Sequence, residues 1–142
     1  MRGREGFRLV HYSVQSNHLH LICEALDRSS LARGLQSLAI RIAKRLNSLW
    51  QRIGRVFADR YHARILRSPR EVRNALAYVL DNAARHGVPI VSGRADPFSS
   101  GRWLHDWRDG ARASIWPRTP VAVARTWLLS VGWKLSGAIT FS

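Results

Sequence analysis

The sequence contains a single cysteine, Cys23, and only 9 acidic residues among its 142 positions. One thiol excludes a disulfide within the chain and any zinc site built from several thiolates. Long apolar runs are missing too: Arg125 and Lys134 interrupt the most hydrophobic stretch, so no run approaches the roughly 20 residues of a membrane span. The basic residues 1–4 precede an alternating pattern and not the apolar core of a signal peptide. We therefore expect a cytoplasmic protein with no membrane partner.

The shortage of acidic residues leaves 23 Lys and Arg almost unopposed, and the formal net charge is +14 at pH 7. Between residues 28 and 85 only Asp59, Glu71 and Asp81 oppose a series of arginines. A solvated basic surface is the simplest alternative, but clustered arginines exceed what solubility requires. The charge therefore favours a polyanionic partner, most simply nucleic acid.

The length and the 46% hydrophobic content indicate one domain with a packed core. Alternating residues predict a β-hairpin with strands over 7–14 and 18–23, joined by the polar residues 15–17. Apolar residues spaced by three and four then predict a long amphipathic helix from residue 29 or 30 to residue 53, ended by Gly54.

The next segment, residues 55–66, predicts a loop followed by a strand that begins near Arg60. Ser68, Pro69 and Glu71 form a capping-box pattern, which predicts a helix over residues 69–86 that Gly87 ends. We assign residues 1–92 to one domain and residues 93–142 to a basic, tryptophan-rich C-terminal extension. Within this extension, residues 120–131 predict a short helix with Thr119 as its cap.

The second predicted strand contains two histidines. His18 and His20 are two positions apart, so their side chains share one face of the strand. Such a pair can chelate one ion, although two histidines on the polar face of a strand need not bind anything. On the helix over 69–86, Tyr78 and Asn82 lie one turn apart on the same side. Tyr78 is equally explained as an amphipathic rim residue, and Asn82 as a solvated one.

Three motifs occur in this order: FRLVHYSVQSNHLHLI at 7–22, GRVFADRY at 54–61 and YVLDN at 78–82. Together they resemble the single-tyrosine HUH transposases, and most closely the REP-associated tyrosine transposase branch. The resemblance spans residues 7–87 in unbroken order, and three motifs at consistent spacing are far more specific than any one of them.

The resemblance implies that His18 and His20 are metal ligands, that Asn82 is the third ligand and that Tyr78 is the nucleophile. The family uses Mg²⁺ or Mn²⁺, and its substrate in DNA transposition is single-stranded DNA, often with a hairpin. Its tyrosine takes the 5′ phosphate and leaves a free 3′ hydroxyl. We expect a monomer or a homodimer.

Weaker assignments concern Arg60, Tyr61 and Arg64, which lie near the middle motif and are candidates for contacts with DNA phosphates. An ordinary charged surface explains all three equally well.

The resemblance also implies an α+β fold with a ferredoxin-like antiparallel sheet, which begins with a strand and a helix before the equivalent of Phe7. Only six residues precede Phe7 here. Loss of that first strand would expose unpaired strand edges. A start codon assigned too late, a truncated relic of a mobile element, and a chain completed by a partner's strand are the three explanations; we favour the first two. The alternative to an active enzyme is a noncatalytic or defunct nucleic-acid-binding fragment.

Overall fold

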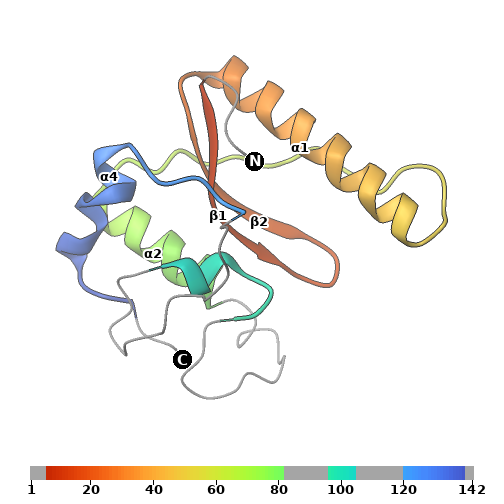
Figure 1. The fold of residues 1–142 in the computed structure, drawn as a ribbon. Coiled ribbons are helices and arrows are strands. Elements are labelled where there is room, and N and C mark those ends of the chain that lie inside the picture. The colour runs from red at the N-terminus through yellow and green to blue at the C-terminus, as the bar shows by residue number, and fades with distance from the viewer. Residues whose placement is uncertain (1–5, 82–95, 105–119, 140–142) are drawn as a thin grey trace.

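The computed structural model describes residues 6–81, 96–104 and 120–139 (Figure 1). The chain forms an α+β fold in which a two-stranded antiparallel sheet packs with helices. Its elements in chain order are strands β1 (Phe7–Val14) and β2 (Leu19–Ala25), helices α1 (Arg28–Leu49) and α2 (Pro69–Leu80), the 3-10 helix η1 (Ser100–Trp103), helix α4 (Trp127–Ser130) and the 3-10 helix η2 (Gly132–Ser136).

The predicted β-hairpin is confirmed, with Phe7 opposite Ala25 and Ser13 opposite His20. A register irregularity lies between Leu9 and His11. Because side chains alternate along β2, Ala25 and His20 lie on opposite faces of the sheet. The two long helices lie on either side of the hairpin (Figure 1), with α1 packed against Phe7 and α2 placed against His20.

The long amphipathic helix is confirmed as α1, but both of its ends differ from the prediction. Its N-cap is Asp27, whose side chain accepts the Ser30 N–H at 2.7 Å. The helix ends at Leu49, and Gln51 already has a φ of 49°. Ile53 is 97% exposed, so no apolar contact favours extending the helix to it.

The capping box that starts α2 is confirmed in both directions. Ser68 Oγ accepts the Glu71 N–H, and the Glu71 carboxylate accepts the Ser68 N–H, each at 3.2 Å. Pro69 is the first helical residue, where its missing N–H is not needed. Helix α2 runs to Leu80 with Asp81 as its C-cap, and the predicted helical residues 82–86 lie outside the described residues.

Two predicted elements are wrong. No strand forms near Arg60: within the described part of the chain the sheet consists of β1 and β2 alone. The predicted helix over 120–131 begins only at Trp127. Residues before it extend along β1 instead, where the Ala122 N–H donates to the Leu9 carbonyl at 2.8 Å.

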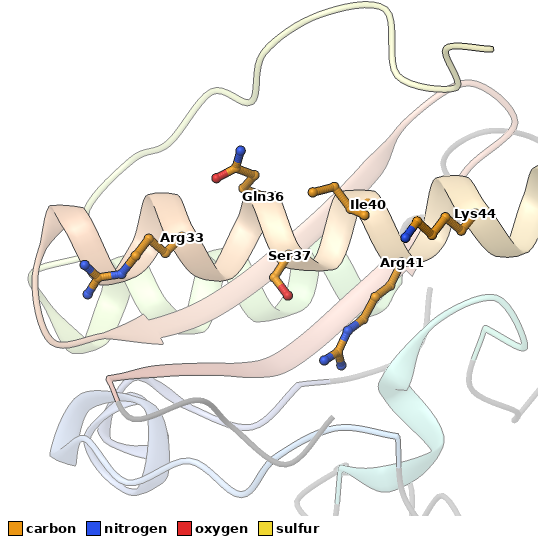
Figure 2. A pocket seen from close by; sticks show the side chains of 6 residues that line it. All are labelled: Arg33, Gln36, Ser37, Ile40, Arg41 and Lys44. Atoms are coloured by element: carbon orange, nitrogen blue, oxygen red, sulfur yellow. The ribbon is translucent and has the colours of Figure 1, made fainter.

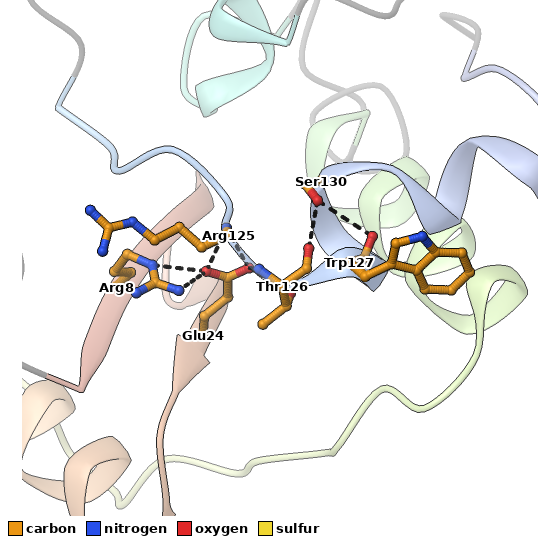
Figure 3. Close-up of polar contacts among 6 residues, drawn as sticks. All are labelled: Arg8, Glu24, Arg125, Thr126, Trp127 and Ser130. Atoms are coloured by element: carbon orange, nitrogen blue, oxygen red, sulfur yellow. Dashed lines mark hydrogen bonds and ion pairs between the residues drawn. The ribbon is translucent and has the colours of Figure 1, made fainter.

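A carboxylate from β2 holds the start of α4 in place (Figure 3). Glu24 accepts the Arg125 N–H at 3.0 Å and both the N–H and the hydroxyl of Thr126, and it also pairs with Arg8 at 2.6 Å. Burial alone would raise the pKa of Glu24, but the hydrogen bonds from Thr126, Arg125 and Arg8 outweigh burial and lower this pKa. The ionised Glu24 carboxylate therefore connects the hairpin to the C-terminal segment through hydrogen bonds.

The core lies on the α2 side of the hairpin and draws on both halves of the chain. Its buried residues come from the strands, from α2 and from segments after residue 96: Val10, Ile22, Val72, Leu76, Val79, Leu80, Leu104, Leu129, Trp133 and Ile139. The described part of the predicted extension thus completes this core, while the boundary at residue 92 lies outside the described residues and stays a prediction. Among the described residues no helix is both long and apolar enough to span a membrane.

Candidate active site

The hairpin brings the two predicted metal ligands together. His18 lies immediately before β2 and His20 lies within it, and their Nε2 atoms are 3.0 Å apart. The rings meet edge to face, with centroids 4.7 Å apart and planes at 83°. Two ligand atoms held about 2.1 Å from one ion at a right angle are also about 3.0 Å apart. The imidazole pair therefore fits chelation of a single ion.

Asn17 determines which nitrogen of His18 can bind a metal. Its Oδ1 lies 2.6 Å from His18 Nδ1, and a carboxamide oxygen only accepts, so Nδ1 carries the proton. When the ring is neutral, its Nε2 then presents a lone pair toward His20. Without an ion the Nε2–H of His20 donates to that lone pair, and for both Nε2 atoms to bind one ion the His20 proton would move to its Nδ1, so that the ring stays neutral.

Helix α2 positions Tyr78 beside the histidines. The buried side chains of Leu76, Val79 and Leu80 fix the rotation of the helix, which leaves Tyr78 on its rim with 42% of its surface exposed. The Tyr78 ring lies edge to face with His20, with centroids 5.1 Å apart and planes at 78°. The Tyr78 side chain is therefore partly accessible from solvent.

The third predicted ligand, Asn82, lies outside the described residues. Within residues 6–81, 96–104 and 120–139 no group of three or more His, Cys, Asp and Glu side chains could hold a metal ion. A two-imidazole site needs further oxygen ligands, and a carboxamide, water or a substrate phosphate supplies the kind of donor that Mg²⁺ and Mn²⁺ accept. The two imidazoles could supply part of such a ligand set, and the ion itself stays a prediction.

Buried polar residues lie on β1, the strand that pairs with the histidine-bearing β2, and were not identified from sequence. Ser13, opposite His20, is fully buried and forms a bridge with Ser99. His11 Nδ1 is 3.1 Å from Ser100 Oγ, and burial lowers the pKa of His11 to about 4. His11 is therefore a neutral part of the core, and only its position in an alternating strand hinted at this role.

The three weaker DNA-binding candidates lie in the segment that precedes α2. Arg60 and Tyr61 are exposed in an irregular segment. Arg64 pairs with Glu71 at 3.1 Å, in the first turn of α2. Tyr78 is seven residues further along α2, or roughly 10 Å along its axis. Contacts between these three residues and DNA stay predictions.

No family model matches the chain, and no curated protein or solved structure matches it either. The comparisons thus supply no relative from which a substrate or a residue role could be taken. The functional argument rests on the residues and on their geometry.

Proposed function

We propose that this chain is a transposase-like enzyme that cleaves and rejoins single-stranded DNA through a 5′-phosphotyrosine at Tyr78. One observation carries the proposal. Residues of two motifs that lie about sixty positions apart meet in space, with the His18 and His20 nitrogens 3.0 Å apart and the Tyr78 ring packed against His20. This grouping is the one expected from the resemblance to the REP-associated tyrosine transposases.

The proposed chemistry is a reversible transfer of a phosphodiester to Tyr78. The phenolate oxygen bonds to phosphorus while the bond from phosphorus to the 3′ oxygen breaks, and the phenol proton passes through solvent to that 3′ oxygen. A later 3′ hydroxyl attacks the same phosphorus, loses its proton and releases the phenolate. The high reference pKa of tyrosine, near 10, makes the phenol a weak nucleophile until it is deprotonated, whereas the phenolate is an acceptable leaving group.

The metal proposed for this site is Mg²⁺ or Mn²⁺, held by His18, His20 and Asn82. When bound, such an ion offsets negative charge that grows on the phosphate oxygens. The neutral imidazoles that Asn17 and the hairpin orient leave the full positive charge of the ion available to the phosphate.

The remaining proposals concern the whole protein. We infer a ferredoxin-like sheet in which a further strand would join β2 at the edge that β1 does not use. The outer edge of β1 is already occupied at Val14, whose N–H donates to the Phe98 carbonyl at 2.8 Å. A hairpin-containing DNA substrate, a monomer or homodimer, and a cytoplasmic location complete the proposal.

A covalent-adduct experiment tests it. Incubation with a labelled hairpin oligonucleotide and Mn²⁺ is expected to give an SDS-resistant protein–DNA adduct, which Tyr78→Phe abolishes because no phenolate can form. Tyr12→Phe is the matched control, since Tyr12 pairs with Leu21 and lies on the sheet face away from His20, and it should keep the adduct. His18→Ala and His20→Ala should reduce it by at least about 100-fold, because both metal ligands are needed.

The outcomes separate the enzyme from its alternative. An adduct that persists undiminished in Tyr78→Phe would overturn the assignment of the nucleophile. A noncatalytic nucleic-acid-binding fragment would give no adduct and would bind DNA with an affinity that ignores Mn²⁺ and survives His18→Ala.

A further inference from the structure

The charged side chains of helix α1 are all basic, and none of them belongs to the proposed active site. Its 22 residues include five basic side chains and no acidic one. An open groove of about 510 Å³ follows its surface (Figure 2). The groove is lined by Arg33, Gln36, Ser37, Ile40, Arg41 and Lys44.

The groove lies on the face of α1 that is turned away from the rest of the chain. At about 100° per residue, its lining residues centre on the side of α1 opposite the apolar stripe that contains Leu31, Leu35 and Ile42. That stripe is half-buried, whereas Arg33, Arg41 and Lys44 are exposed. The two ion pairs among the described residues, Arg8 with Glu24 and Arg64 with Glu71, lie elsewhere. The groove therefore presents three cations to solvent together with two polar side chains.

We propose that this groove, defined by those six residues, is a second nucleic-acid surface that binds the phosphate backbone without reading its sequence. Arg33 and Lys44 are eleven residues apart, roughly 16 Å along the helix axis. A DNA strand in a duplex advances about 3.4 Å per nucleotide, so this length matches about five nucleotides. Gln36 and Ser37 add neutral donors of the kind that bond to phosphate oxygens.

Nucleic acid fits the groove better than an anionic membrane does. A basic helix that lies on a membrane inserts its apolar face into the lipid. The apolar stripe of α1 is instead half-buried in its own chain, and its N-terminal half packs through Gly34 on the Phe7 ring. The proposal depends on the proposed function only in taking DNA as the partner, and it does not require chemistry at Tyr78.

The test is equilibrium binding of fluorescent single-stranded and hairpin oligonucleotides, measured by anisotropy in EDTA over a range of salt concentrations. The groove variant is Arg33→Ala/Arg41→Ala/Lys44→Ala. The control is Arg67→Ala/Arg70→Ala/Lys134→Ala, which removes the same charge from other exposed positions. Circular dichroism checks that both variants keep the wild-type helical signal, and a glutamine version of the groove variant replaces the alanine version if that one does not fold.

The groove variant is expected to bind roughly 10- to 100-fold more weakly near 0.1 M salt, and its salt dependence should fall by about 2 to 3 units of slope. The control should lose less than about one unit of slope. Equal losses in both variants would show a general charge effect and overturn the proposal, as would unchanged binding in the groove variant. A groove variant that loses affinity only for anionic vesicles would also overturn it.

Tyr78→Phe separates this proposal from the enzymatic one. It should bind both oligonucleotides with wild-type affinity even though it forms no adduct. Loss of binding in the groove variant together with absence of any wild-type adduct would support the groove while rejecting the proposed chemistry.

Discussion

At the scale of single residues, the proposed metal-binding geometry depends on a neighbour that is not itself a proposed ligand. Asn17 was expected only as a turn residue, yet its Oδ1 fixes the proton of His18 on Nδ1. The alternation of a strand is enough to predict that His18 and His20 share a face. It says nothing of which nitrogen each ring presents, because that depends on a hydrogen bond between side chains.

Asn17→Ala should therefore weaken Mn²⁺ binding by about 10- to 100-fold, since His18 loses the acceptor that fixes its tautomer and ring orientation. Isothermal titration calorimetry of the metal alone measures this. Gln15→Ala is the control, because Gln15 donates to Ser13 and not to a histidine, and it should keep wild-type affinity. Equal affinity in Asn17→Ala and wild type would show that Asn17 does not orient the ligand.

His11 predicts a pH dependence of stability that is separate from metal binding. Burial lowers the pKa of His11 from 6.5 to about 4, so the unfolded chain takes up a proton between these values while the folded chain does not. Stability is then complete above pH 6.5 and falls as the pH drops toward 4, by about 3 kcal/mol in total. Urea unfolding of wild type and His11→Gln across this range should show the decline in wild type alone; the same decline in both would assign it to another group.

At the scale of elements, sequence patterns a few residues long predicted the secondary structure correctly. The hairpin, α1 and the Ser68–Glu71 capping box are set by residues a few positions apart, and all three are confirmed. The predictions of a strand near Arg60 and of a full helix over 120–131 are wrong, because the conformation of these segments depends on partners that are distant in sequence. Glu24 and Leu9 hold residues 122–126 extended, and no local pattern in those residues reveals a contact across about a hundred positions.

The packing of α1 on β1 depends on Gly34. A Cβ at this position would overlap the Phe7 ring, so Gly34→Ala must move the helix or the ring. Alanine favours a helix over glycine by about 1 kcal/mol, but overpacking costs about 1–3 kcal/mol, and we expect a net loss of stability. Ser48→Ala, at an exposed position of the same helix, should change stability by less than about 0.5 kcal/mol. A stabilised Gly34→Ala protein would show that α1 does not pack there.

At the scale of the whole molecule, the described parts of the chain form one core across its two halves. Leu104, Leu129, Trp133 and Ile139 come from the predicted extension and pack with β1, β2 and α2. Trp133, from the tryptophan-rich extension, is 2% exposed. The particular partners could not be predicted, because core contacts between distant segments carry no local signature.

Glu24 connects β2 to the C-terminal segment through polar contacts. Glu24→Gln should destabilise the fold by about 1–3 kcal/mol at neutral pH, because the hydrogen bonds from Arg8, Arg125 and Thr126 lose their charged acceptor. Trypsin should then cut after Arg125 faster in the native protein, as mass spectrometry of early fragments would show. Glu71→Gln, which weakens the cap of α2 instead, should not speed that cut. An unchanged cutting rate in Glu24→Gln would show that Glu24 does not hold the segment around Arg125 in place.

The central claim is that Tyr78 takes the 5′ phosphate of a DNA strand, and locating the covalent bond tests it most directly. The protein is incubated with a hairpin oligonucleotide and Mn²⁺, the DNA is trimmed with nuclease, and tryptic peptides are sequenced by mass spectrometry. We predict a nucleotide mass on Tyr78 and an unmodified Tyr12 and Tyr61. A nucleotide attached to any other residue, or a Tyr78 peptide that never carries one, would contradict the account.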